Sequence, residues 1–219
     1  MKISRILSVI FALALVLFLL TAAISLPIYC RGFYYAHIEP MNLPARTGRS
    51  AEEIRAAYDE VLDYLTLRDR EFGTGVFPHS PEGAAHFADC KGLFDLNRNV
   101  LLTSAAVLAL LLLLRRKFGP YRLGNRSAAF WAAIFAVVLP IGIGGLAATN
   151  FDRAFVIFHS IFFPGKTNWV FDWYADAIIQ VLPQDFFMHC ALLIGGGLLF
   201  FSLVVLILSL AGEKKTRVS

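Results

Sequence analysis

Four long stretches of this 219-residue chain contain no Asp, Glu, Lys or Arg: residues 6–30, 99–114, 127–151 and 186–212. Hydrophobic residues make up 58% of the chain, a larger share than soluble domains usually have. A bilayer core about 30 Å thick is crossed by about 20 apolar helical residues, and three of the four stretches reach that length. The lack of charge therefore favours an all-α membrane protein with four transmembrane helices over a soluble protein with buried helices.

Two of the stretches need a closer look. The stretch 99–114 is short, but Arg98, Arg115 and Arg116 can extend their charged ends to the interface while the helix continues past them. The stretch 6–30 is longer than the apolar part of a signal peptide, about 7–15 residues, and it ends in SLPIYCRGF, without a small-x-small cleavage site. We therefore expect both to be membrane helices of the protein.

Charged residues are distributed unevenly between the segments that join these helices. Loop 115–126 has five basic residues and no acidic one, whereas segment 31–97 has seven basic and eleven acidic residues. Segment 150–185 has two basic and four acidic residues. Because cytoplasmic loops carry an excess of Lys and Arg, both termini are predicted in the cytoplasm and the two acidic segments outside the cell. The net charge of +4 then reflects topology and contact with anionic lipids, and gives no sign of a nucleic-acid partner.

These boundaries predict eight consecutive parts of a multi-pass protein. They are transmembrane helix 1–30, extracellular cap 31–97, transmembrane helix 98–118, cytoplasmic loop 119–126, transmembrane helix 127–150, outer loop 151–183, transmembrane helix 184–211 and cytoplasmic tail 212–219. The outer segment 31–97 is too long for a simple connector, so we expect it to form a small cap. The chain has no internal repeat and no low-complexity segment.

The clearest element of the cap is SAEEIRAAYDEVLDYL, which predicts an amphipathic helix. Ser50 and Glu53 have the spacing of a capping box. Apolar residues follow with helical periodicity: Ile54, Ala57, Tyr58, Val61, Leu62 and Leu65. A helix of this kind cannot bury its apolar face alone, so it is expected to pack on the rest of the cap or to lie at the membrane surface.

A second cap helix is predicted to begin near Pro81 and to run on toward the second transmembrane helix. Ser80 has the residue type of an N-cap, and Pro81 and Glu82 suit the first helical turn. The helix would place four residues on one face: His86, Asp89, Cys90 and Leu93. His86 would then lie just outside the membrane, with Asp89 close enough to orient it.

The second outer segment begins NFDRAFVIFHSIFFPG, and it places His159 among aromatic residues. Phe155, Phe158, His159 and Phe162 share a helical face, which Pro164 and Gly165 would end. Pro183 is a suitable start for the last helix. His159 and His86 are therefore predicted at the same depth, where the cap meets the membrane.

Several kinds of catalytic site are poorly supported. The three cysteines form no CxxC pair, and they permit one disulfide, Cys30 with Cys90, without implying a framework. His86, Asp89 and His159 could form a metal site, but catalytic zinc usually has a close pair such as HExxH, so no metal or other cofactor is expected. The chain has no GxSxG motif, and a thiol nucleophile at Cys90, facing His86, has no other support.

The aromatic residues and the histidines also have structural interpretations. Phe162, Phe163, Trp169 and Trp173 would suit an interfacial belt, although Phe is less typical of a belt than Trp or Tyr, and a pocket for an acyl chain is the alternative. His86 and His159 could each be hydrogen-bonded structural residues. The remaining histidines have no local constellation and are predicted to be structural: His37, His79 and His189.

Several motifs together resemble one family. The motifs are Y..VLDYL, S..G..HFADCKGLF, FHSIFF with W.FD, and IIQVLPQDFF. In this order, and with the four apolar stretches, they resemble the bacterial lipoprotein intramolecular transacylase family, found in low-GC Gram-positive bacteria. The resemblance covers nearly the whole chain. One departure is Cys90, where the family pattern would have a small aliphatic residue.

The resemblance implies a fold, an activity and a site. It implies four transmembrane helices with an extracellular cap, in the bacterial plasma membrane among membrane lipids. The implied substrate is a lipoprotein with a diacylglyceryl group on its N-terminal cysteine, whose sn-2 acyl chain moves to the α-amino group and leaves a lyso-form lipoprotein. The implied catalytic residues are His86 and His159. We expect support from Asp89 and from Asp172 or Asp176, and a substrate pocket of Phe158, Phe162, Phe163, Trp169 and Phe171.

Histidine suits this reaction, which is the aminolysis of an ester. The amine, with a pKa of about 7.7–8.0, must lose a proton, and the glyceryl oxygen must gain one. Histidine can do either near neutral pH. Which histidine is the base and which the acid is left open. The alternative function is a non-catalytic membrane protein whose cap binds a lipid, a peptide or a partner protein, and hydrolysis to free fatty acid is a third outcome.

Overall fold

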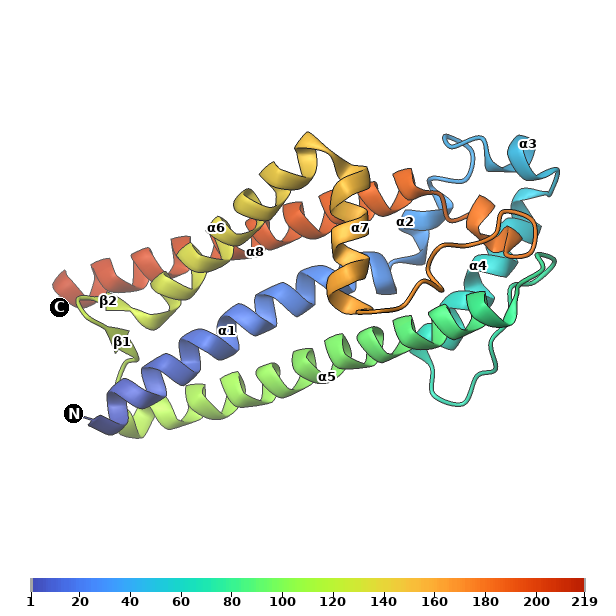
Figure 1. Cartoon of the computed structure of the whole chain (residues 1–219). Coiled ribbons are helices and arrows are strands. Elements are labelled where there is room, and N and C mark those ends of the chain that lie inside the picture. The colour runs from blue at the N-terminus through green and yellow to red at the C-terminus, as the bar shows by residue number, and fades with distance from the viewer. Residues whose placement is uncertain (1, 219) are drawn as a thin grey trace. The chain divides into compact units, whose positions relative to one another are not determined.

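In the computed structural model, the described part of the chain consists of helices, the loops that join them and one short hairpin (Figure 1). The structure describes residues 2–218, without the side chains of residues 2, 143, 146–148 and 215–218. Met1 of the predicted first helix and Ser219 of the predicted tail lie outside the described residues. The elements are α1 (Lys2–Tyr29), α2 (Arg31–Tyr35), α3 (Leu43–Thr47), α4 (Ala51–Thr66), α5 (Pro81–Phe118), β1 (Arg122–Leu123), β2 (Arg126–Ser127), α6 (Ala128–Thr149), α7 (Phe151–Phe162), the 3₁₀ helix η1 (Ala177–Gln180) and α8 (Gln184–Val218).

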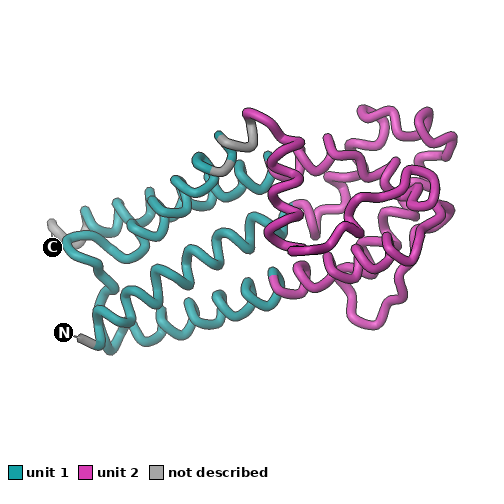
Figure 2. The backbone as a smooth tube through the Cα atoms, in the orientation of Figure 1, with its two compact units in different colours: residues 1–26, 97–148, 192–219 teal, residues 27–96, 149–191 magenta. Residues whose placement is uncertain are grey.

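The chain divides into two compact units, each formed by segments distant in sequence (Figure 2). Unit 1 consists of Met1–Leu26, Asn97–Ala148 and Leu192–Ser219. Unit 2 consists of Pro27–Leu96 and Thr149–Ala191. Unit 2 therefore contains almost all of the predicted cap together with the predicted outer loop, and it contains both candidate histidines.

Unit 1 contains most of the apolar helical residues. Among the described residues, three helices are long and apolar enough to cross a membrane: Ile3–Tyr29, Pro81–Phe118 and Gln184–Lys214. In α6 the described apolar stretch, Ala128–Gly142, is shorter. The all-α class and three spans agree with the prediction from the sequence, and the fourth span stays a prediction. Leu113, Leu192 and Leu208 are each about two-thirds exposed, which suits side chains that face lipid.

The hairpin β1–β2 occupies the predicted cytoplasmic loop, and hydrogen bonds tie it to three helices of unit 1. The Tyr121 hydroxyl donates to the carbonyl of Leu111 in α5 at 2.7 Å. The backbone N–H of Arg122 donates to Ser8 Oγ in α1 at 3.0 Å. The carboxylate of Glu213 in α8 accepts from the backbone N–H of Ser127 at 2.7 Å. The loop is therefore an ordered connection.

Helix α4 contributes its apolar face to the core of unit 2, which is one of the two placements that the sequence left open. The capping box is present: Ser50 Oγ accepts from the backbone N–H of Glu53, and the Glu53 carboxylate accepts from the backbone N–H of Ser50. Its buried residues are the six of the predicted apolar face. Tyr34 stacks on Tyr58 at 3.8 Å between ring centroids and donates its hydroxyl to the carbonyl of Val181 at 2.7 Å. The apolar face thus packs on other segments of unit 2.

Helix α5 is continuous from Pro81 to Phe118, so it begins well before the predicted transmembrane segment 98–118. Its 38 residues extend about 57 Å, nearly twice the thickness of a bilayer core. Charged residues such as Asp89 and Lys91 lie in its first part, and the uncharged run 99–114 lies in its second part. The first part belongs to unit 2, outside the run suited to a membrane.

Candidate active site

His86 and His159 lie side by side in unit 2, although 73 positions separate them in the sequence. Their ring centroids are 5.7 Å apart, a distance that the sequence did not provide. His86 lies near the start of α5, and His159 lies in the last turn of α7. Both side chains are buried, with 5% and 6% of their surfaces exposed.

The surroundings of His159 fix its proton. Its Nδ1 lies 2.7 Å from the backbone carbonyl oxygen of Phe155, one helical turn earlier. A carbonyl only accepts, so Nδ1 carries the hydrogen and, in the neutral ring, Nε2 holds the free lone pair. Burial lowers the pKa of His159, against an opposing effect of the Phe155 hydrogen bond. His159 is therefore a neutral imidazole with a basic nitrogen available.

His86 is bonded differently. Its Nε2 lies 3.4 Å from the sulfur of Cys90, one turn later in α5. Its Nδ1 is buried without a hydrogen-bond partner. Burial, reinforced by the nearby His159, lowers the pKa of His86 to about 4. His86 is therefore neutral at physiological pH and has one ring nitrogen unused.

Cys90 is unsuited to be the nucleophile. Burial raises the pKa of its thiol to about 12, so the reactive thiolate is scarce at neutral pH. The disulfide that the sequence permitted is not formed, because all three cysteines, Cys30, Cys90 and Cys190, are free. The raised pKa of Cys90 argues against thiol catalysis.

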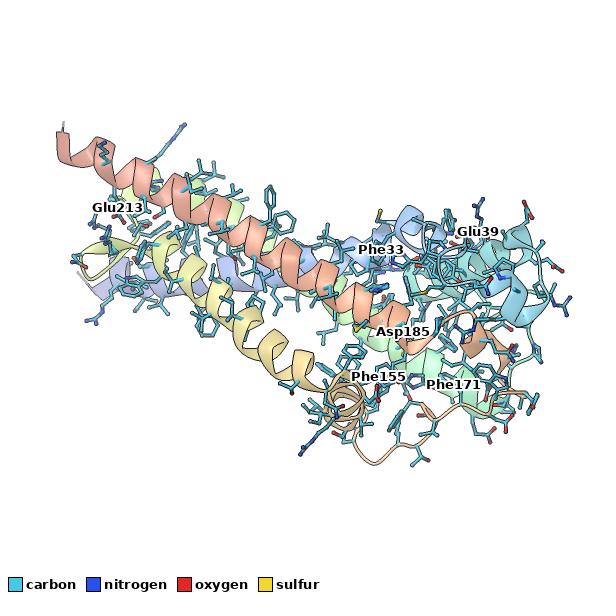
Figure 3. All side chains as sticks on the ribbon, turned by 90° about the horizontal axis from the view of Figure 1, so that it is seen from above. Phe33, Glu39, Phe155, Phe171, Asp185 and Glu213 are labelled. Carbon is cyan, nitrogen blue, oxygen red and sulfur yellow. The ribbon has the colours of Figure 1, made fainter. Side chains whose placement is uncertain are left out.

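Aromatic rings enclose the two histidines. Trp169 stacks on His159 at 4.5 Å between ring centroids, and Phe163 presents its edge to His86 at 4.9 Å. The ring of Phe171 also lies near His86, at 5.4 Å between ring centroids. Figure 3 labels Phe171, on the segment after α7, and Phe155, on α7 itself. The walls of the site therefore come from α7 and from the segment that follows it.

The predicted pocket residues differ in how closely they approach the histidine pair. Phe163 is buried beside the pair, and Trp169 and Phe171 also contact the histidine rings. Phe158 touches His159 but is 45% exposed. Phe162 packs on Phe158 at 4.6 Å and is also half-exposed. Sequence reasoning did not include Phe155 in the pocket, although its position one turn before His159 is the signal that could have identified it.

Asp89 does not orient His86, contrary to the expectation from the sequence. Its carboxylate forms an ion pair with Lys166 and accepts a hydrogen bond from Nδ2 of Asn168 at 3.1 Å. These contacts, with Lys166 the largest, lower the pKa of Asp89. A full positive charge attracts a carboxylate more strongly than a neutral imidazole does. Asp89 therefore anchors the segment that carries Trp169.

The described hydrogen bonds of the Asp172 and Asp176 carboxylates go to backbone groups and to Ser80, and none of them joins either residue to His159. The Asp172 carboxylate accepts from the backbone N–H groups of Tyr174 at 2.9 Å and Ala175 at 2.7 Å, as in an Asx-turn. The buried Asp176 accepts from the backbone N–H of Ser80 at 2.7 Å and from its hydroxyl at 2.8 Å. The start of α5 is thereby fixed to the loop that carries Phe171.

Gly83 allows these segments to approach each other. A Cβ atom at this position would collide with the carboxylate of Asp176 and would lie 3.3 Å from Cε1 of Phe171. Since Phe171 covers His86 one turn later, the absence of a side chain at Gly83 helps to set the position of that ring.

The other three histidines have contacts of their own. Nδ1 of His79 lies 2.9 Å from the hydroxyl of Thr74. Nδ1 of His37 lies 2.7 Å from the carbonyl of Phe33, and its ring lies 4.9 Å from that of His189. Within the described part of the chain, no group of three or more His, Cys, Asp and Glu residues is arranged to hold a metal ion.

Comparison with known proteins identifies a family and similar solved structures. The model of the family described as "Lipoprotein intramolecular transacylase Lit" matches residues 9–187. The in meso structure of the membrane integral lipoprotein intramolecular transacylase Lit from Bacillus cereus superposes with a TM-score of 0.92 and 26% identity, covering 100% of this chain and 99% of that one. A structure of the same Bacillus cereus protein with a histidine-to-alanine mutation superposes with a TM-score of 0.83 and 26% identity, covering 100% and 97%.

A curated relative without an assigned activity also matches. An uncharacterized protein of Aquifex aeolicus is 29% identical over 96 residues, which are 44% of this chain and 44% of that protein, so the match spans less than half of the relative. The family model, by contrast, covers most of this chain, including both histidines and the aromatic segment between α7 and α8. The chain belongs to the lipoprotein intramolecular transacylase (Lit) family.

Proposed function

We propose that this protein moves the sn-2 acyl chain of a diacylglyceryl-modified lipoprotein to the α-amino group of its N-terminal cysteine, giving the lyso-form. The observation that carries the proposal is the pair of neutral, buried histidines, 5.7 Å apart, that leave different ring nitrogens available. Family membership supports the reaction class. Structures of the Bacillus cereus protein with one histidine changed to alanine or to arginine are consistent with a role for a histidine in this family.

His159 is the proposed general base. As the amine attacks the ester carbonyl, a C–N bond forms and the nitrogen gives a proton to the free Nε2 of His159. When the tetrahedral intermediate collapses, the bond to the glyceryl oxygen breaks, and His159 returns the proton to that oxygen. Positioned proton transfer of this kind contributes typically about 10²–10⁴-fold.

His86 is the proposed electrophile. In its Nδ1–H tautomer it can donate a hydrogen bond to the oxygen on which negative charge develops. A neutral imidazole can do this without becoming charged, and the lowered pKa of His86 keeps the ring neutral. The low polarity of the aromatic walls strengthens such a hydrogen bond. No covalent enzyme intermediate is required.

The aromatic walls have two proposed tasks. The amine and the ester belong to one molecule but are joined by a flexible linker, so holding them in an attack geometry can contribute up to about 7–11 kcal/mol. Phe163, Trp169 and Phe171 are rigid rings that suit an acyl chain. They also exclude water, which would otherwise hydrolyse the ester.

The proposed location is the bacterial plasma membrane, with both termini in the cytoplasm and the segments 31–97 and 150–185 outside. The charge distribution supports this topology, because the basic residues concentrate in loop 115–126 and near the termini. The outer surface is where diacylglyceryl-modified lipoproteins are held by their acyl chains, so the substrate would meet the site among the membrane lipids.

The test is to express the protein in a Gram-positive host without such an enzyme, and to analyse the N-terminal tryptic peptide of an abundant lipoprotein by mass spectrometry. We expect an unchanged total acyl mass, with fragments that show one chain on nitrogen and a lyso-glyceryl thioether. His86→Ala and His159→Ala should abolish this signal, whereas the control His79→Ala should keep it.

Other outcomes would overturn the proposal. If the wild type accumulates in the membrane and the peptide keeps two glyceryl-linked chains and a free amine, a binding role for the outer segments replaces catalysis. Release of free fatty acid, with a single remaining chain, would make the protein a hydrolase. Full transacylation by both histidine variants would remove the pair from the site.

A further inference from the structure

The contact between Cys90 and His86 bears on which nitrogen of His86 carries the hydrogen. Sγ of Cys90 is 3.4 Å from Nε2 of His86, and the two residues are one turn apart on α5. Nδ1, the other nitrogen of the same ring, is buried without a partner. Because His86 is only 5% exposed, bulk water is a poor substitute partner for either nitrogen.

A neutral imidazole has one N–H and one lone pair, so the two nitrogens cannot behave alike. A thiol can donate its hydrogen, and it is a weak acceptor, whereas an imidazole lone pair is a good acceptor. The favourable pairing therefore runs from the Cys90 S–H to Nε2, which leaves the ring hydrogen on Nδ1. Burial raises the pKa of Cys90, so the thiol keeps the hydrogen that it donates.

The charged groups around His86 offer no equivalent bond. Asp89 on α5 is held by Lys166 and Asn168 of the segment after α7. Lys166 and His159 both act against a positive charge on His86, and His159 uses its own Nδ1 for the carbonyl of Phe155. Cys90 thus supplies the described hydrogen bond to the His86 ring.

We propose that Cys90 is a positioning residue that holds His86 in the Nδ1–H tautomer, so that Nδ1 presents its hydrogen to the reacting ester. This inference rests on the proposed function, in which His86 donates a hydrogen bond to the developing oxyanion. Cys90 itself touches no substrate. A small aliphatic residue at position 90 would leave the tautomer to other contacts.

The direct test is ¹⁵N NMR of the full-length protein labelled at histidine, because the two nitrogens of each neutral tautomer differ in chemical shift. We expect His86, assigned by its absence in His86→Ala, to be protonated at Nδ1 in the wild type and in Cys90→Ser, whose hydroxyl can also donate. In Cys90→Ala the signals should move toward a mixture of tautomers. A wild-type His86 protonated at Nε2 would overturn the inference.

The kinetic test uses purified protein and a synthetic diacylglyceryl lipopeptide. The expected loss of kcat in Cys90→Ala is about two- to tenfold, the range of one hydrogen bond, with a KM close to that of the wild type. Cys90→Ser should recover most of the rate. The matched control is Cys190→Ala, which removes another partly buried thiol that packs on the unit 2 core.

The possible failures are distinguishable. If Cys90→Ala and the wild type have equal kcat, or if Cys90→Ser is as slow as Cys90→Ala, the positioning role is wrong even though the enzyme works. If the wild type forms no N-acyl product, the proposed function fails, while the NMR measurement still tests the tautomer. That measurement on the wild type also remains decisive if Cys90→Ala does not fold.

Discussion

The indole of Trp169 is stacked on the imidazole of His159, with ring centroids 4.5 Å apart and planes inclined by 28°. The indole N–H donates to the carbonyl of Lys166 at 3.0 Å, so the indole is itself held in place. His159 is also restrained at the edge of its ring, where Nδ1 bonds to the carbonyl of Phe155. One contact sets the plane of the ring, and the other sets its tautomer.

Replacing Trp169 tests the first of these restraints. Ring pairs of this kind contribute about 0.5–1.5 kcal/mol, so Trp169→Ala should lower kcat by about two- to tenfold. The kcat of Trp169→Phe should lie between those of the wild type and Trp169→Ala, because this variant keeps a ring but loses the indole hydrogen bond. Single-turnover rates on the lipopeptide would measure the effect, with the exposed Trp173 changed to Ala as a control. Equal rates for Trp169→Ala and the wild type would show that the stack does not position His159.

The pH dependence of kcat/KM follows from the lowered pKa values of the histidines. Burial lowers the pKa of His159 below the usual histidine value of about 6.5, so protonation of this base should limit the rate only at a pH below that of an ordinary histidine. The substrate amine, with a pKa of about 7.7–8.0, does limit it. The rate should rise with pH, with an inflection at about 7.7–8.0, and level off above it. An inflection near 6.5 would contradict a buried, neutral base.

His86 should also make the protein less stable in acid. Its pKa is about 4 in the folded protein and about 6.5 in the unfolded chain, so the unfolded chain binds more protons between these values. The contribution to stability is therefore complete above pH 6.5 and is lost as the pH falls toward 4. In thermal unfolding measurements, lowering the pH from 7.5 to 5 should reduce the Tm of the wild type more than that of His86→Gln. Parallel curves would show that His86 is not desolvated.

The ion pair between Asp89 and Lys166 should couple two segments of the site. We expect Asp89→Asn and Lys166→Gln each to slow turnover severalfold without unfolding the protein, because either change loosens the segment that carries Trp169. A double-mutant cycle should give a coupling energy of about 0.2–1 kcal/mol, since Lys166 is half-exposed. Strict additivity of the two changes would mean that the ion pair has no role in positioning the segment.

The capping box of α4 should contribute to the stability of unit 2 and not to the chemistry. Ser50→Ala removes the acceptor for the backbone N–H of Glu53 and should cost about 0.5–2 kcal/mol. The Tm of the purified protein should fall while kcat at 25 °C stays unchanged. Glu52→Gln, in the same turn but outside the box, serves as the control. A loss of kcat in Ser50→Ala would place α4 closer to the reaction than the structure does.

Local features of the fold were predictable from the sequence. The capping box and the six buried residues of α4 depend on neighbours within the helix, so residue spacing along the sequence identified them. The contact between Cys90 and His86 was predictable for the same reason, because it joins residues one turn apart. The two histidines were selected by their motifs, but their separation depends on how α5 and α7 pack.

Features that depend on distant residues were not predictable. Asp89 was expected to orient His86 because it lies three residues further along the helix, but Lys166, 77 residues away, provides a full charge. Asp172 and Asp176 were expected near His159 because they follow it in the chain, yet the turn and the start of α5 use their oxygens. In each case an acceptor was taken by a stronger or closer donor that no sequence spacing reveals.

Gly83 limits which changes the site can accept. A single methyl group at this position would have to displace the carboxylate of Asp176, which accepts from Ser80 at the start of α5, and would also shift the ring of Phe171 slightly. The first displacement would free the start of the helix that carries His86, and the second would move the ring that lies 5.4 Å from it. Engineering the site for a bulkier or differently shaped acyl chain would therefore have to begin from this missing methyl group, because it sets the clearance between the start of α5, Asp176 and Phe171.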